Sequence, residues 1–135
     1  MIEPDVEARE AALRKIDAQV AGAAVHAERM QILAASIASV DATERSHNDE
    51  LSVTVDVAGR LLDVTFSDRA LDLGRERLAE VLLTTVRAAY RSASERSVEL
   101  AAEVLGEDSP TVTKIRTDAE TRMPPLPHEG EGRDA

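Results

Sequence analysis

The basic side chains are the residues of this sequence that could do chemistry, because guanidinium and ammonium groups form ion pairs with phosphate oxygens. Arg87 and Arg91 are four positions apart, so on a helix they lie on one face. Arg9, Arg14 and Lys15 form a smaller group near the start of the chain. Each of these side chains could instead be solvated or pair with a nearby glutamate. The candidate phosphate-binding residues are Arg9, Arg14, Lys15, Arg87, Arg91 and Arg96.

No set of residues has the spacing of a catalytic or metal site. His26, His47 and His128 are scattered along the chain without the spacing of metal ligands. Asp49, Glu50 and Asp63 could suggest paired carboxylates, but they fall in predicted strands or turns, where we expect them to be solvated. The chain has no cysteine and no phosphate-binding glycine loop, nucleophile elbow or dinucleotide-binding glycine pattern. We therefore expect no enzyme activity, no cofactor and no metal.

The overall charge is unfavourable for an anionic partner. The 135 residues carry a net charge of -10, which repels nucleic acids and anionic membranes on average. By segment, residues 46–73 hold 2 basic and 6 acidic side chains, whereas residues 74–106 hold 5 of each. Binding to nucleic acid would therefore need a local basic surface.

Sequence features also predict a location. No apolar run approaches the roughly 20 residues that a membrane span needs. The N-terminal stretch MIEPDVEARE is acidic and lacks the basic and apolar regions of a signal peptide. We expect a cytoplasmic protein that does not bind membranes.

The stretch LSVTVDVAGRLLDVTF, residues 51–66, alternates apolar and polar residues and predicts an antiparallel β-hairpin. Gly59 supplies the positive φ that a tight turn at Ala58 and Gly59 requires. The turn could also be one residue longer. A one-residue slip would expose half of the apolar set, so the register is well specified. It places Val55 opposite Leu62, Val53 opposite Val64, and Leu51 opposite Phe66, and these six residues are also the predicted dimer interface.

A long helix is predicted before the hairpin. Apolar residues repeat every seven positions from Val6 to Ala34, and a second line runs from Ile16 to Ile37. This is the a/d pattern of a coiled coil, and it predicts a helix from about residue 5 to 42. Residues 43–50, TERSHNDE, then break the apolar pattern.

A second long helix is predicted after the hairpin, over residues 75–105, from apolar residues at three- and four-residue spacing. Gly106 follows as a C-terminal cap. Ser109 and Pro110 then begin a short, weak helix to about residue 121, before an acidic, proline-rich end. We expect an α+β fold with a dimerising domain over residues 1–106 and an acidic, largely disordered tail over residues 107–135.

The composition predicts that one chain buries too little apolar surface to be stable alone. The hydrophobic fraction is 43%, but much of it is alanine, and Tyr90 and Phe66 are the only aromatic residues. Each alanine hides little surface, so burial contributes little free energy. A symmetric dimer would supply the missing cover and close an exposed strand edge.

The order of elements resembles the YbaB/EbfC family of bacterial nucleoid-associated proteins, in particular its divergent actinobacterial members. The stretches that carry the resemblance are ELSVTVDVAGRLLDVTFSDRAL and RLAEVLLTTVRAAYRSASERSVELAAEVLG, and the match covers roughly residues 5–105. The resemblance implies an α-β-α chain that dimerises through its sheet, with DNA held by helices that project like the arms of tweezers. The sequence departs from the family in its strong acidic balance and in the stretch ATERSHNDE, where the family usually has glycine and methionine.

Two hypotheses follow from these observations. In the first, the protein is a homodimeric, nucleoid-associated factor that binds double-stranded DNA with little sequence specificity through the six basic residues named above. In the second, it is an acidic dimeric adaptor or chaperone-like module that binds another protein. The resemblance favours the first hypothesis and the net charge favours the second. Neither involves a small-molecule substrate.

Overall fold

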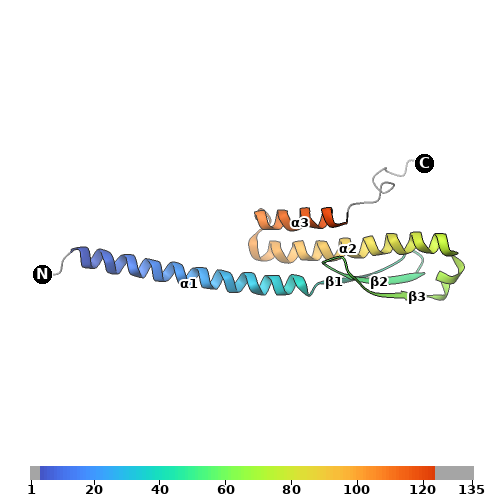
Figure 1. Ribbon diagram of the computed structural model, residues 1–135, viewed down its shortest axis with the longest axis horizontal. Helices are drawn as coiled ribbons and strands as arrows, with labels where there is room; N and C mark the ends of the chain where they lie inside the picture. The colour runs from blue at the N-terminus through green and yellow to red at the C-terminus, as the bar shows by residue number, and fades with distance from the viewer. Residues whose placement is uncertain (1–3, 124–135) are drawn as a thin grey trace. The chain divides into compact units, whose positions relative to one another are not determined.

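The computed structural model describes residues 4–123 (Figure 1). It confirms the predicted α+β fold of long helix, antiparallel sheet and long helix. The chain divides after Ala35 into two units, which are described separately. In chain order the elements are α1 (Pro4–Ala38), β1 (Asp41–Arg45), β2 (Leu51–Asp56), β3 (Leu61–Phe66), the 3-10 helix η1 (Asp68–Asp72), α2 (Arg75–Leu105) and α3 (Pro110–Arg122).

The first unit consists of α1 as far as Ala35. Pro4 and the acidic Asp5 suit the first turn of a helix, where the N–H groups are unpaired and the helix dipole is positive. Among the described helices, none combines the length and the apolar character needed to cross a membrane. Leu33 is buried, but most large apolar side chains of this unit are 43–63% exposed, namely Val6, Leu13, Ile16, Val20, Val25 and Ile32.

The second unit contains a three-stranded antiparallel sheet in the order β1-β2-β3. The prediction of a two-stranded sheet was therefore incomplete, and α1 ends at Ala38 rather than near residue 42 because residues 41–45 form β1. This strand has no apolar alternation to reveal it. All five of its residues pair with β2, from Asp41 opposite Asp56 to Arg45 opposite Ser52. Two side-chain contacts add to this pairing: Thr43 Oγ1 lies 2.7 Å from Thr54 Oγ1 of β2, and Ser92 of α2 donates a hydrogen bond of 2.7 Å to Glu44.

The predicted hairpin register is confirmed except next to the turn. Leu51 pairs with Phe66 and Val53 with Val64, but Val55 pairs with Leu61 rather than Leu62. The loop has three residues, 57–59, and is closed by a 3.0 Å hydrogen bond from the N–H of Asp56 to the carbonyl of Arg60. Gly59 adopts a φ of 86°, as this turn requires. The longer loop shifts the pairing by one residue, and a β-bulge absorbs the shift.

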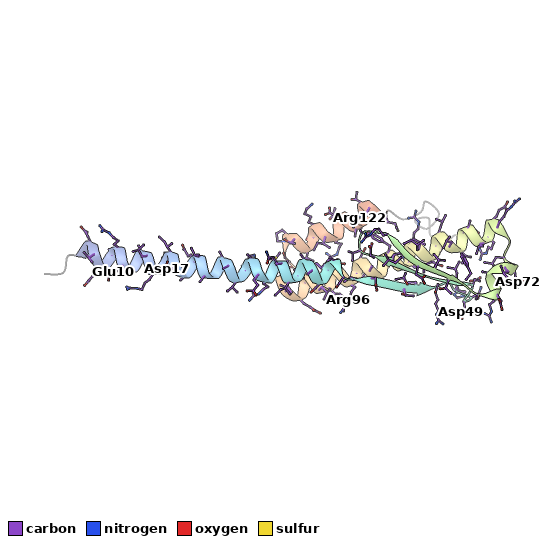
Figure 2. The ribbon with its side chains drawn as sticks, turned by 60° about the horizontal axis from the view of Figure 1, so that its bottom comes forward. Glu10, Asp17, Asp49, Asp72, Arg96 and Arg122 are labelled. Carbon is purple, nitrogen blue, oxygen red and sulfur yellow. The ribbon has the colours of Figure 1, made fainter. Side chains whose placement is uncertain are left out.

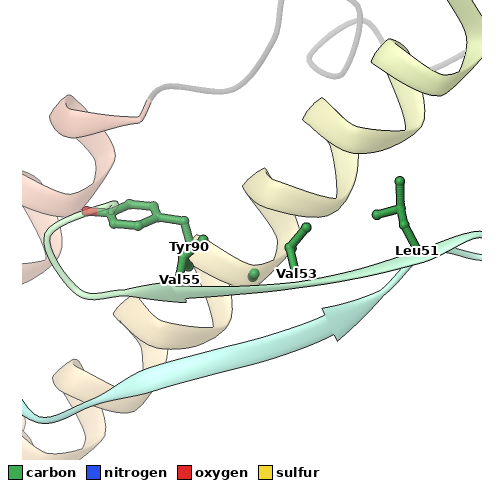
Figure 3. Close-up of a cluster of buried hydrophobic side chains, with 5 residues drawn as sticks. Leu51, Val53, Val55 and Tyr90 are labelled. Carbon is green, nitrogen blue, oxygen red and sulfur yellow. The ribbon is translucent and has the colours of Figure 1, made fainter. Parts of the chain in front are cut away.

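The sheet packs against α2 of the same chain (Figure 3). Leu51, Val53 and Val55 alternate along β2 and are 3%, 0% and 0% exposed. They pack with Ala89 and Tyr90 of α2. Alternate residues of a strand share one face of the sheet, and residues three or four apart share one side of a helix, so these two apolar surfaces can bury each other. The small side chain of Ala89 lets the helix backbone approach the sheet closely. This contact is the hydrophobic core of the second unit.

The short helix α3 confirms the helix predicted after Ser109. The Ser109 hydroxyl caps it by accepting a 3.2 Å hydrogen bond from the N–H of Thr111, and Pro110 occupies the first turn. Figure 1 shows α3 running back beside the C-terminal half of α2. Residues 110–122 of the predicted tail are thus folded, whereas residues 124–135 lie outside the described residues. The domain boundary at residue 106 stays a prediction.

Two buried carboxylates hold the ends of β2. The expectation that Glu50 is solvated was wrong. Glu50 is 5% exposed, and its carboxylate accepts a 2.7 Å hydrogen bond from Ser46 Oγ. This bond holds the pKa of Glu50 below its ordinary value of 4.5, despite burial. Asp56 is 6% exposed and accepts hydrogen bonds from the N–H groups of Ala58 and Arg60 at 3.0 and 2.9 Å. The bond from the Arg60 N–H, with help from its guanidinium, lowers the pKa of Asp56 from 3.8.

These lowered pKa values predict that acid destabilises the fold. The unfolded chain binds protons at a higher pH than the folded chain, so the stabilisation is complete near neutrality and is lost as pH falls through the folded pKa values. We expect the free energy of unfolding, measured by urea titration from pH 7 to pH 3, to decline below about pH 4.5, the ordinary pKa of Glu50. Glu50→Gln should be less stable than wild type at pH 7, and its free energy of unfolding should fall less than that of wild type as the pH is lowered. Glu103→Gln, at an exposed position of α2, is the control, and an unchanged pH profile for Glu50→Gln would contradict the prediction.

Candidate nucleic-acid interface

Three of the six predicted phosphate-binding residues lie on α2, and the structure brings two of them together. Arg91 is exposed, and Arg87, one turn earlier on the same face, is half-buried with its Nε atom inaccessible to solvent. Arg96 follows Arg87 by nine residues, which is about two and a half turns, so it points to the opposite side of the helix. Figure 2 labels Arg96 on α2. The three arginines therefore do not form one basic patch.

Arg91 lies in an open hollow of about 560 Å³ that α2 shares with α3. Its apolar floor includes Val98 and Ala119. A phosphate entering this hollow would meet two guanidinium groups and four carboxylates, so the local charge is unfavourable for it. The charged residues that line the hollow are Arg91, Glu95, Glu99, Glu107, Arg116 and Glu120.

Surface ion pairs engage other basic side chains of the helices. Arg96 lies 3.7 Å from Glu99, so the alternative of pairing with a nearby glutamate holds for this residue. A similar pair on α3 joins Lys114 to Asp118 at 3.4 Å. Exposed pairs of this kind contribute only about 0–1 kcal/mol, so a phosphate group can replace the carboxylate at little cost.

The remaining predicted residues, Arg9, Arg14 and Lys15, are exposed on α1 in the first unit. At 3.6 residues per turn they spread around the helix instead of forming one stripe. The acidic Glu10 and Asp17 project from the same part of α1 (Figure 2). These basic residues are accessible to a phosphate backbone, but acidic neighbours offset their field.

A contact that the sequence did not predict joins three distant parts of the second unit. Arg122, at the end of α3, donates hydrogen bonds of 3.0 Å each to the Tyr90 hydroxyl and to the carbonyl oxygen of Val57. Tyr90 belongs to α2 and Val57 to the loop after β2. Because these residues are 32 and 65 positions from Arg122, no local pattern could reveal the contact.

Together, these features define a class of protein: a small α+β chain with two long helices, whose basic side chains are spread over extended surfaces. Within residues 4–123, no group of three or more histidine, cysteine or acidic side chains could hold a metal ion.

The model of the YbaB/EbfC DNA-binding family matches residues 14–108, and the chain belongs to this family. Among curated proteins no match is found. The family match confirms the resemblance inferred from the sequence, and it ends before α3 begins.

Proposed function

We propose that this protein binds double-stranded DNA as a homodimer with little sequence specificity, as a nucleoid-associated protein of the cytoplasm. The observation that carries the proposal is the match to a DNA-binding family over residues 14–108, which include α1 from residue 14 onward, the whole sheet and all of α2. Two long helices provide extended surfaces that suit contact with a phosphate backbone. Such contact positions a protein on DNA without reading the bases.

The free edge of the sheet supports a homodimer. β3 pairs only with β2 among the described strands, so its outer edge offers unpaired N–H and carbonyl groups. Leu62 and Phe66 are 52% and 50% exposed on this strand. The β3 strand of a second copy could pair with this edge in a symmetric dimer. The pairing would cover both side chains and would give hydrogen-bond partners to the free N–H and carbonyl groups of both strands.

The six predicted interface residues divide into two groups in the structure. Leu51, Val53 and Val55 already lie buried beneath α2 of their own chain. Val64 of the edge strand is partly buried and also packs against this core, so the proposed interface rests chiefly on Leu62 and Phe66.

We propose that the basic side chains predicted from the sequence make the phosphate contacts, and that a dimer doubles their number. The net charge of -10 opposes such binding, so it must depend on local contacts that salt weakens. Unrelated duplexes should accordingly bind with similar affinity, and log affinity should fall linearly with log salt concentration. A fluorescence polarisation series from low to physiological salt tests this, and no binding at low salt would contradict the proposal.

Arg87 and Arg91 carry a specific prediction. We expect Arg87→Ala with Arg91→Ala to lower DNA affinity about tenfold and to reduce the salt slope by about two per protomer, since each phosphate contact contributes about 0.9 to the slope. The control is Arg75→Ala with Arg77→Ala, which changes the net charge equally at the start of α2. An equal loss of DNA affinity in the two double variants would show that only the net charge matters. It would contradict the assignment of Arg87 and Arg91 as phosphate-binding residues.

A protein partner is the second candidate function, and the exposed apolar line of α1 favours it. The side chains of Leu13, Ile16 and Val20 are 53%, 51% and 63% exposed, which is unusual for a helix of a monomeric protein. If no duplex binds at low salt while this protein is a dimer, the adaptor hypothesis becomes the better reading.

A further inference from the structure

The hollow between α2 and α3 is a surface that DNA binding leaves unexplained. Its lining residues run from Arg91 to Ala102 on α2 and from Arg116 to Glu120 on α3, at three- and four-residue spacing. Such spacing places each set on one side of its helix, so two neighbouring helices face the same hollow. The family match ends at residue 108, so the α3 side of the hollow lies outside the matched region. We propose that this hollow binds a basic amphipathic helix of a partner protein.

The length and the floor of the hollow suit a helix. From Arg91 to Ala102 it extends about 16 Å along α2 at 1.5 Å per residue, which is about three helical turns. Val98, Ala102 and Ala119 of its floor are half-buried, so part of their apolar surface is accessible in the single chain. Apolar surfaces with a polar rim are typical of protein-binding sites. An amphipathic helix lays its apolar side into a groove of this kind.

The charge of the lining selects a basic partner. Four carboxylates and two guanidinium groups give the lining a net charge of -2, the same sign as the -10 of the whole chain. Glu99 pairs with Arg96, but among the described residues Glu95, Glu107 and Glu120 form no ion pair. Lysine or arginine side chains beside the apolar side of a bound helix would pair with these three carboxylates. Complementary charges of this kind provide specificity and speed association.

Other segments of this chain are unsuited to the hollow by the same argument. Residues 1–35, which contain the exposed apolar line of α1, carry 6 acidic and 4 basic side chains. Residues 124–135 carry 3 acidic side chains and 1 basic side chain. Each segment would bring further negative charge to an acidic surface. The occupant is therefore a different protein and not a second copy of this chain.

A model peptide tests this chemistry. The probe is a fluorescent peptide of about 15 residues made of leucine and lysine, with the leucines at three- and four-residue spacing. A matched peptide has glutamate in place of lysine. We expect the full chain to bind the lysine peptide at least about tenfold more tightly than the glutamate peptide in fluorescence polarisation, and the affinity should fall as salt is raised.

Removal of carboxylates locates the binding site. Glu95→Gln with Glu120→Gln should weaken binding of the lysine peptide about fivefold, because two exposed ion pairs are lost. The control is Asp72→Asn with Glu76→Gln, which changes the net charge equally. Glu76 lies about 28 Å from Glu95 along α2, beyond the range of screened charges at physiological salt, so the control should stay within about twofold of wild type.

The apolar floor provides a test that changes no charge. Ala102→Phe should fill part of the hollow and weaken binding of the lysine peptide about tenfold, since the bound helix could no longer fit closely. Ala79→Phe adds the same ring at an exposed position of α2 and should leave the affinity unchanged. Circular dichroism checks that both variants are folded, and the carboxylate variants decide if Ala102→Phe is not.

Several results would overturn the proposed partner site. These are no binding of the lysine peptide by wild type, equal binding of the two peptides, and equal losses in the hollow variants and their controls. A smaller solution mass of folded Ala102→Phe than of wild type would assign the hollow to contact between copies and would also overturn it. The site does not rest on DNA binding, so failure of the duplex experiments leaves it standing, and its own failure leaves the proposed function standing.

Discussion

We expect Val55→Asp to abolish cooperative folding at neutral pH. Val55 is fully buried between β2 and α2, and its surroundings in the core are Val53, Ala89 and Tyr90. An aspartate there loses its hydration without gaining a hydrogen-bond donor, and even the protonated form is poorly accommodated. The expected loss is about 4 kcal/mol or more, against a typical total stability of about 5–15 kcal/mol. Circular dichroism during thermal and urea unfolding measures the effect.

The matched control for this variant is Ala58→Asp. It introduces the same charge three residues away, at an exposed position of the hairpin loop. Its stability should stay within about 0.5 kcal/mol of wild type, as for most surface substitutions. A cooperative unfolding transition of Val55→Asp close to that of wild type would show that the contact between β2 and α2 is not the core of the second unit.

The second large effect is expected at the free edge of the sheet. We expect the double variant Leu62→Asp with Phe66→Asp to be a folded monomer, whereas the wild type is a dimer. Both side chains are about half-exposed in the single chain, so a charge there costs little in the monomer. In a symmetric dimer four aspartates would be buried together, which should weaken association at least about 100-fold. Solution mass from light scattering over a concentration series measures this.

An exposed leucine elsewhere provides the control for dimerisation. Leu83 of α2 is 55% exposed, and Leu83→Asp should leave the dimer intact. A monomeric wild type at micromolar concentration would contradict the proposed dimer. A double variant that remains dimeric would instead place the interface away from β3.

Much of the fold could be predicted because it depends on periodic patterns. The bounds of α2 follow from apolar spacing and from Gly106, and the apolar face of β2 follows from strict alternation. The strand β1 could not be predicted, because its residues show no apolar alternation and its backbone pairing with β2 leaves no pattern in the sequence. The bulge near Val55 escaped prediction because the register alone does not fix the length of the turn.

The candidate site was less predictable than the fold. Residue types identified the basic side chains, and helical spacing grouped Arg87 with Arg91. The same spacing argument would already have separated Arg96 from Arg87, since nine residues place them on opposite sides of a helix. Glu95 and Glu99, on α2 with Arg91, follow from the same helical spacing, but Glu107 and Glu120 could not be foreseen, because they reach the hollow only when the chain folds back along α2.

By itself, the sequence determined the type and order of the long helices, the hairpin and its apolar face, and the resemblance to a DNA-binding family. These features depend on residues close together in the chain, where side-chain period and turn chemistry act directly. Only the tertiary structure decided that α2 covers the sheet, that β1 joins it, and that Arg122 ties α3 to Tyr90. The physical reason is that such contacts join side chains distant in the sequence, often through single hydrogen bonds that leave no periodic pattern.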